Sequence, residues 1–533
     1  MWLTTQPFLR VVSALEQNGL RGLTTLYAAV GVWIVYLVGL AVYRCTLEDI
    51  TKNHSPALTV FPTLTYWYEI YYDVLLEGRY FTRIAQMHEK YGPIVRINPH
   101  EVHFNDPKFI HHLFPGPSRK TDKYVFTGRR TGTQNSIVAT VDHDLHRRRR
   151  NTINAFFSSA SIRRLEPIMQ ESMANLLRRM DEAGRKKEIL PMHYVIKACT
   201  SDVITKFAFG DSFHFLDEED FATPYMKATD VFHLFNHAMC HFPIVGKMLA
   251  AAPDWAIHML IPGLSAMWHK KGLWLEQVLN IKHSPNPDRV KSTIFEGILA
   301  SKAPEEEKED HRLAHEAQLI VFAGQGTTAY TLNAAIYQLL ANPRVLKRAK
   351  DELAQVIPQA GQVPTYHQIE TLPYFSAVVQ EVLRVHPGIV SRLPRVSPDV
   401  PIIYDDDNTG KRYVIPAGTP TSMTIQIAHM NPDAFEDPYE FRPERWLGNP
   451  GLHEAFIGFA RGTRNCIGLN FARQEVFIIL ATIIRKYDLY QGQEGPTLEL
   501  YDTVRERDID VVRDMIIPFP ARGSHGLRLR VRA

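Results

Sequence analysis

The segment from Phe459 to Gly468, with the sequence FARGTRNCIG, constrains the fold of this chain more than any other feature. It places Cys466 directly before an apolar run from Leu469 to Ile484, which predicts a helix. A cysteine at the start of a helix is favoured as a thiolate, because unpaired backbone N–H groups and the helix dipole stabilise negative charge there. The segment therefore predicts a cysteine that can ligate a metal.

The residues around this cysteine suit a flat, anionic cofactor. Gly462 and Gly468 permit a tight loop and the close approach of a ring face, because glycine has no side chain. Arg464 offers a fork of donors for a propionate, and Phe459 is expected to shield the sulfur from water. We therefore expect Cys466 to hold the iron of a haem. A buried cysteine that happens to begin a helix is the alternative.

The segment matches the pattern F-x-x-G-x-R-x-C-x-G completely, and in this the chain resembles the cytochrome P-450 family. Two further family motifs stand in the expected order: Glu381 and Arg384 form an E-x-x-R element, and Arg445 lies in the sequence FRPERW. The resemblance implies that these three residues form a charge-assisted triad that locks the loop behind the haem. It also implies a mainly α fold with small β-sheets, as a single large haem domain over residues 76–533.

A long apolar helix is predicted from His311 to Leu340, and its centre carries the sequence AGQGTT at residues 323–328. Two glycines inside a helix cost about 1 kcal/mol each relative to alanine, so they imply a reason. The sequence is similar to the family's A-G-x-(D/E)-T-T segment, which implies that Thr327 is the catalytic hydroxyl that orders water for proton delivery. A threonine that only bonds back to its own helix is the alternative.

The segment departs from the family at Gly326, which stands where an acidic residue is usual. Glycine cannot pass a proton. Either a water chain through Thr327 and Gln325 suffices, or the reaction needs less proton relay than ordinary hydroxylation.

Further contacts to the haem propionates are implied by the resemblance. The family often has a tryptophan four residues before an arginine in an early helix, and the run HRRRR at residues 146–150 stands in that place. His146 and Arg150 are therefore predicted propionate partners, and Arg395 and His429 are further candidates. A solvated basic helix face is the alternative for the arginines of that run.

The stretch from Gly22 to Tyr43 contains no charged residue and predicts a membrane anchor. As a helix it would span about 33 Å, enough for a bilayer core of roughly 30 Å. Residues 1–21 are then a short tail, residues 22–43 a single transmembrane helix and residues 44–75 a linker. Basic residues flank the anchor equally on both sides and leave its orientation open. The resemblance implies the endoplasmic reticulum membrane, with a cytosolic haem domain; the sequon at Asn53 leaves glycosylation open.

The composition limits the kinds of partner that we expect for this chain. A net charge of +3 on 533 residues does not imply nucleic acid, and four widely separated cysteines argue against a zinc site or a disulfide scaffold. No G-x-G-x-x-G fingerprint opens a βαβ unit, so electrons must come from a separate NADPH-dependent cytochrome P-450 reductase.

The resemblance implies a haem b monooxygenase that uses O2 on a lipophilic substrate. The runs RINPHE and HRRRR look most like fungal members of secondary metabolism such as trichodiene oxygenase, which favours a terpenoid or meroterpenoid. The substrate pocket is expected to be lined by residues 115–140, 225–250, 388–394 and 516–518 and by the helix before Thr327. A haem-thiolate isomerase or dehydratase that needs no external electrons is one alternative, and a non-catalytic haem binder is the other.

Overall fold

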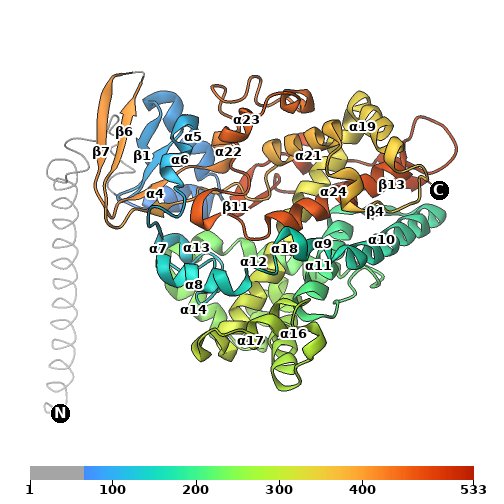
Figure 1. The fold of residues 1–533 in the computed structure, drawn as a ribbon, viewed down its shortest axis with the longest axis horizontal. Coiled ribbons are helices and arrows are strands. Elements are labelled where there is room, and N and C mark those ends of the chain that lie inside the picture. Colours follow the sequence, from blue (N-terminus) through green and yellow to red (C-terminus); the bar gives the residue numbers. More distant parts are fainter. Residues whose placement is uncertain (1–64, 408, 533) are drawn as a thin grey trace, which may run out of the picture.

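The computed structural model describes residues 65–407 and 409–532. The predicted tail, the anchor, Asn53 and most of the linker lie outside these residues. Among the described residues, helices dominate and the strands form small, separate sheets in different parts of the domain (Figure 1). No helix of this part combines the length and the apolar character that a membrane crossing needs. The mainly α fold class is thus confirmed for the described domain.

The last residues of the predicted linker belong to the packed domain. The short helix α4 (Trp67–Ile70) and the π-helical turn η1 (Tyr71–Leu75) bury the side chains of Glu69, Ile70 and Asp73. Residues 67–75, which the sequence analysis assigned to the linker, therefore pack onto the described domain.

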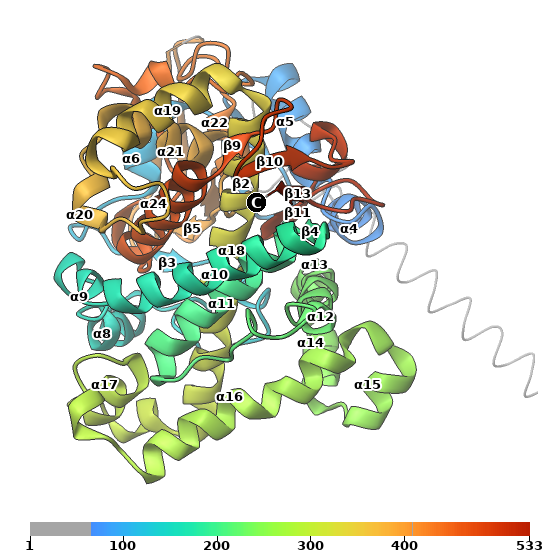
Figure 2. The same cartoon turned by 90° about the vertical axis from the view of Figure 1, so that its right-hand side faces the viewer.

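Helix α18 (Asp310–Ala341) runs through the middle of the molecule (Figure 2) and extends one residue beyond the predicted helix at each end. Helices α11 (Met192–Phe209), α16 (Ser265–His283) and α24 (Leu469–Lys486) pack against it. Gly324 allows the close contact with α11, because a Cβ at this position would lie 2.6 Å from Cγ1 of Ile204.

The other longer helices arise mainly from amphipathic stretches. In α10, for example, Met169, Met173, Leu176 and Met180 recur at helical spacing and are all buried, which gives the helix one apolar face. These helices are α5 (Tyr80–Tyr91), α8 (His143–Ile153), α10 (Glu166–Lys186), α12 (Thr223–His233), α14 (Pro243–Ala251), α19 (Pro343–Val356) and α21 (Pro373–Val385).

Shorter helices connect them: α6 (Ile110–Leu113), α7 (Val125–Gly128), α9 (Ser159–Arg163), α13 (Asn236–His241), α15 (Asp254–Leu260), α17 (Ile294–Ala300), α20 (Tyr366–Ile369), α22 (Ile425–His429) and α23 (Leu452–Ala455).

The largest sheet joins strands from distant parts of the chain in the order β1-β2-β8-β5-β3. Its strands are β1 (Ile94–Arg96), β2 (Val102–Phe104), β3 (Asp122–Lys123), β5 (Arg395–Val396) and β8 (Pro420–Ser422). β2 runs parallel to β8, and β3 runs antiparallel to β5 with Lys123 directly opposite Arg395. This register places two basic side chains together, which matters for the site.

The other sheets are smaller. A four-stranded sheet has the order β4-β13-β10-β9, and β6-β7 and β11-β12 are hairpins. Their strands are β4 (Ile189–Pro191), β6 (Ile402–Asp406), β7 (Lys411–Ile415), β9 (Asp488–Leu489), β10 (Thr497–Leu500), β11 (Arg513–Met515), β12 (Ile517–Phe519) and β13 (Arg528–Arg532).

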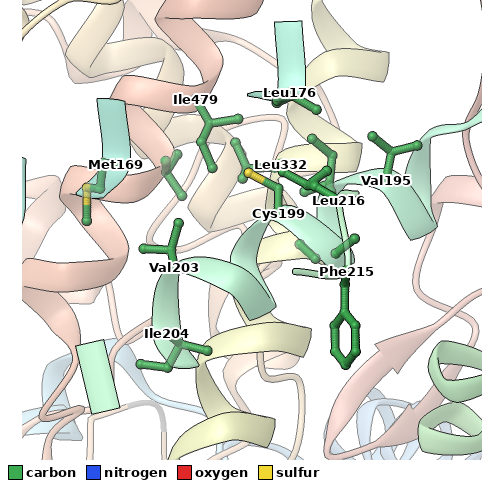
Figure 3. Close-up of a cluster of buried hydrophobic side chains, with 14 of the residues drawn as sticks. Met169, Leu176, Val195, Cys199, Val203, Ile204, Phe215, Leu216, Leu332 and Ile479 are labelled. Atoms are coloured by element: carbon green, nitrogen blue, oxygen red, sulfur yellow. The ribbon is translucent and has the colours of Figure 1, made fainter. Parts of the chain in front are cut away.

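The main hydrophobic core lies where α10, α11, α18 and α24 meet. Figure 3 shows Cys199 of α11 there, close to Leu332 of α18 and Ile479 of α24. All three side chains are fully buried. This junction fixes the central helix relative to the helix that follows Cys466.

Candidate active site

Cys466 lies in the turn between the 3-10 helix η7 (Gly462–Arg464) and α24. It is exposed, whereas Cys199 and Cys240 are buried. The N–H of Cys466 donates to the carbonyl of Phe459 at 2.8 Å, which closes the loop. The sulfur is thus presented outside the hydrophobic core, as a ligand must be.

Opposing influences act on the Cys466 thiol. Desolvation by the surrounding protein raises its pKa, while the N–H of Gly468 and the charge of Arg150 lower it. The predicted stabilisation by the helix start is therefore present, and Arg150 adds to it, although desolvation outweighs both in the protein alone. Bonding to a metal cation would shift the balance to the thiolate.

Gly462 and Gly468 differ in how far the structure requires a glycine at their positions. Gly462 has a φ of +72°, and a Cβ there would lie 2.4 Å from the carbonyl oxygen of Pro115, so only glycine fits. A Cβ at Gly468 would make only an ordinary contact of 3.9 Å with Sγ of Cys466, so the packing of the protein itself leaves room for a side chain there.

In the middle of α18, small side chains form one face of the helix that is open to solvent. Ala323 is exposed and Thr327, one turn further on, is half-buried, whereas Val321, Gln325 and Ala329 are buried. The Thr327 hydroxyl donates to the carbonyl of Ala323 at 2.9 Å. A hydrogen bond to its own helix is the alternative role that the sequence analysis gave for Thr327. A reacting group would have to compete with this bond for the hydroxyl.

The segments expected to line a pocket meet around this face. A Cβ at Gly388 would lie 2.9 Å from Cβ of Thr327, and one at Gly326 would lie 3.5 Å from Cδ1 of Ile517. The N–H of Val390 donates to the carbonyl of Ile516 at 3.1 Å. The 388–394 and 516–518 segments therefore lie beside the helix that carries Thr327, and Ile517 brings an apolar side chain to it.

A group of basic side chains, which we call the basic cluster, gathers between the Cys466 loop and the largest sheet. It consists of Lys123, His146, Arg395 and Arg464. Burial lowers the pKa of Lys123 to about 7, with further lowering by Arg395 and Arg464. Burial and Arg464 lower the pKa of Arg395 to about 9, and burial followed by Arg464 lowers that of His146 to about 3. No carboxylate in the described part of the chain offsets the burial of these three groups, whereas Asp122 and Asp142 partly offset the burial of Arg464.

The hydrogen bonds of the basic cluster are made mainly to backbone carbonyls. Arg464 donates to those of Thr121, Thr140 and Val141, and the Lys123 amine donates to that of Val138 at 2.6 Å. Among the described residues, no carboxylate pairs with Lys123 or Arg395. Like charges directly opposite in a strand pair are destabilising. The cluster therefore fits an anionic group such as the propionates of a haem.

Lys123 was missed by the sequence prediction. Its sequence neighbourhood, TDKY, has no motif. Only the pairing of β3 with β5 brings it opposite Arg395.

Arg150 and His429, two of the predicted propionate partners, form hydrogen bonds with other groups of the protein. Arg150 donates to Asn465, at 2.7 Å to its backbone oxygen and 2.8 Å to Oδ1, and so braces the Cys466 loop beside the basic cluster. Both ring nitrogens of His429 are occupied: Nδ1 lies 3.0 Å from the carbonyl oxygen of Arg384, and Nε2 accepts from the N–H of Ile457 at 3.0 Å. The structure therefore does not place His429 with the propionate candidates.

The three charged residues of the E-x-x-R and FRPERW motifs form one buried network. Arg384 donates to both oxygens of Glu381 at 2.8 and 2.9 Å, and Nε of Arg445 donates to the same carboxylate at 3.0 Å. Trp446 adds a fourth bond at 2.9 Å. Removing one partner of such a buried set typically lowers the stability of the fold by about 3–5 kcal/mol. The network therefore fixes α21 against the loop that leads to Cys466.

A loop-presented cysteine, a small exposed face on a long helix and a basic cluster together make up the candidate site. The family model "Cytochrome P450" matches residues 59–504. The chain therefore belongs to the cytochrome P-450 family.

Fungal relatives extend this result over nearly the whole chain. The cytochrome P-450 monooxygenase tpcC of Cochliobolus heterostrophus is 36% identical over 504 residues, which cover 93% of this chain and 95% of the relative. Fusicoccadiene C-8 hydroxylase of Phomopsis amygdali is 34% identical, with 92% and 93% covered. Tryptophan 6-hydroxylase fscE of Fusarium equiseti is 32% identical, with 94% and 96% covered. The chain is a cytochrome P-450 monooxygenase, and the family implies a haem with a cysteine thiolate ligand.

Proposed function

We propose that this monooxygenase oxidises a terpenoid or meroterpenoid of fungal secondary metabolism at a haem b held by Cys466. The observation that supports the substrate class is the apolar side chain of Ile517, which lies beside Gly326 next to Thr327. Apolar lining of this kind favours a lipophilic substrate. A relative named for hydroxylating fusicoccadiene, a terpene, supports this choice. A relative named for tryptophan makes an indole substrate the second candidate.

Two features of the chain would hold the haem, and together we call them the haem seat. Cys466 supplies a thiolate, and the basic cluster supplies Lys123, Arg395 and Arg464 for the propionates, with His146 as a neutral N–H donor. Phe459 closes the loop on the sulfur. Arg150 and the Glu381 network hold the loop in place, so that the ligand needs little reorganisation when the cofactor binds.

When bound, the haem supplies reductive activation of O2, with one oxygen atom entering the substrate and the other leaving as water. The protein's share is to orient substrate and to control protons. The apolar side chains on the 388–394 and 516–518 segments hold a lipophilic substrate and keep bulk water out. The Thr327 hydroxyl, released from the Ala323 carbonyl, orders water on the exposed face of α18.

Membrane attachment at the endoplasmic reticulum is the proposed location. Large apolar side chains are exposed on α14 and α15, and others on α4 and η1. Helix α13 contacts both α4 and α14, so these surfaces belong to one region of the molecule. They are Trp67, Tyr71, Leu75, Ile244, Met248, Trp255, Met259 and Leu260. An exposed apolar region of this kind suits a lipid surface beside the predicted anchor.

The test is reconstitution of the full chain with an NADPH-dependent cytochrome P-450 reductase in lipid vesicles. A terpenoid substrate should accelerate NADPH use and yield a product with one oxygen atom from labelled O2. Product from tryptophan, with none from any terpenoid, would favour the indole candidate. Conversion without NADPH or O2 would instead fit the isomerase alternative.

A further inference from the structure

Arg130 is a buried cation that has no acidic partner in the part of the chain that the structure describes. It lies just after α7, its side chain is only 5% exposed, and it forms no ion pair with a described carboxylate. Its Nε is fully buried and has no hydrogen-bond partner there. A buried charge is costly unless an opposite charge pairs with it. Arg130 therefore suits an anionic ligand from outside the chain.

The neighbours of Arg130 place it between α13 and the basic cluster. Burial raises the pKa of the Cys240 thiol of α13 to about 11, while the charge of Arg130 and a hydrogen bond from it lower that pKa. A thiol is a weak acceptor and compensates little of the guanidinium charge. Arg130 also contributes to the low pKa of Lys123, about 7, of which burial is the main cause.

Glu69 is the acid of this region whose charge reaches Cys240. Its Oε1 pairs with Arg392, and the side-chain amide of Asn98 donates to its Oε2 at 2.9 Å. Both carboxylate oxygens of Glu69 are therefore engaged by other groups. This leaves the Arg130 guanidinium available for a carboxylate that the chain does not supply.

The loop that carries Arg130 is linked to the exposed face of α18 through aromatic side chains. A Cβ at Gly132, two residues further on, would lie 3.5 Å from Cζ of Phe232. The ring of Phe232 in turn packs on that of Phe322, with centroids 5.7 Å apart. Phe322 directly precedes Ala323, which belongs to the exposed face. Two rings thus connect this loop with the face on which the substrate is proposed to lie.

The same loop also reaches α18 directly. The N–H of Asn135 donates to Nδ1 of His315 at 3.3 Å, and the N–H of Ile137 donates to the Glu316 carboxylate at 3.0 Å. These two helix positions precede Ala323 by about two turns. The loop therefore extends from α12 to the first half of α18, along the border of the exposed face.

We propose that Arg130 binds the carboxylate of an acidic, otherwise lipophilic substrate and so holds that substrate against the exposed face of α18. The guanidinium offers a planar fork of donors that matches a carboxylate. The apolar side chain of Ile517 beside the same helix suits the rest of the molecule. The inference rests on the proposed function and narrows its substrate to a terpenoid acid or, for the second candidate, an indole acid.

The central test compares acids with neutral molecules of the same skeleton. The probes are abietic acid with its methyl ester, and N-acetyltryptophan with its amide, titrated by calorimetry into the haem-loaded full chain. Wild type should bind at least one acid at least about tenfold more tightly than its neutral counterpart, because only the acid forms charge-assisted hydrogen bonds. Equal affinities within both pairs, or no binding of either acid, would overturn the proposal.

Three variants test whether this preference for acids depends on Arg130. Arg130→Gln should abolish the preference, whereas Arg130→Lys, which keeps the charge but not the fork, should retain part of it. Arg129→Gln is the matched control, since Arg129 donates to the carbonyl of Cys240 at 3.4 Å and is a neighbour of the same charge. This control should keep the full preference. A preference that survives in Arg130→Gln would overturn the proposal.

Haem content separates substrate binding from a role of Arg130 in the haem seat. Folded Arg130→Gln should bind haem as wild type does and show the same carbon monoxide spectrum. Weaker haem binding in this variant would place Arg130 with the propionate partners and overturn the proposal. If Arg130→Gln does not fold, Arg130→Lys decides, because a preference for acids as large as that of wild type would contradict the role of the fork.

The outcome is independent of turnover, because the titrations measure binding alone. Oxygenated product from a neutral terpenoid, with no preference for acids, would leave the proposed function standing and remove this inference. A preference for acids that depends on Arg130, without any oxygenated product, would instead support the anion site and contradict the proposed function.

Discussion

Lys123 and Arg395 face each other across a strand pair with no carboxylate between them. The pKa of Lys123, lowered to about 7 by burial and its basic neighbours, leaves the amine only partly charged near neutrality. A bound propionate would raise that pKa, so haem binding takes up a proton at Lys123. This contribution to affinity is present at low pH and is lost as the pH rises above about 7.

Haem titration of the apoprotein between about pH 6 and pH 9 measures this effect. Cys466 must lose a proton to bind iron, so its own contribution has the opposite sign. The matched variant Lys123→Met isolates the lysine: wild type should lose affinity relative to this variant as the pH rises. An identical pH dependence in both proteins would remove Lys123 from the haem seat.

Single residues could be predicted from the sequence where a rare pattern specified them. The Cys466 loop and the Glu381, Arg384 and Arg445 network fall in this group, because spacing within a motif carries their geometry. Lys123 could not be predicted, since its role depends on a register between distant strands. His429 was assigned by analogy, and the backbone groups that occupy its ring nitrogens are invisible in the sequence.

At the scale of elements, the two glycines of α18 have distinct roles. A Cβ at Gly324 would press on Ile204 at 2.6 Å, whereas one at Gly326 has ordinary room. Gly324→Ala should destabilise the protein by about 1–3 kcal/mol, as overpacking does. Gly326→Ala should be neutral or gain up to about 1 kcal/mol from helix propensity. Urea unfolding of the two variants checks this difference, and equal effects would contradict the packing of α18 on α11.

Helices were more predictable than sheets. The long helix was expected within one residue of α18 because its apolar periodicity extends over many turns. The pairing of β2 with β8, between Val102 and Thr421, could not be expected, because short apolar strands do not specify their partners. The burial of Glu69 and Asp73 could not be predicted either, because acidic side chains are normally exposed to solvent.

For the whole molecule, the exposed apolar region on α14 and α15 predicts how the domain meets a bilayer. Trp255 is 67% exposed, whereas Trp274 is buried. In vesicles with brominated acyl chains, the full-length protein should show tryptophan quenching that decreases in Trp255→Phe. The matched variant Trp274→Phe should leave the quenched signal unchanged. Equal quenching in wild type and Trp255→Phe would mean that this surface does not contact lipid.

The central claim is that the Cys466 sulfur holds haem iron, and the carbon monoxide difference spectrum of the purified, reduced protein tests it most directly. Wild type should show the Soret band characteristic of thiolate-ligated haem, and Cys199→Ala, which alters a buried cysteine, should keep it. Cys466→Ala should lose the band. A wild-type protein without porphyrin, or a band that survives in Cys466→Ala, would contradict the account.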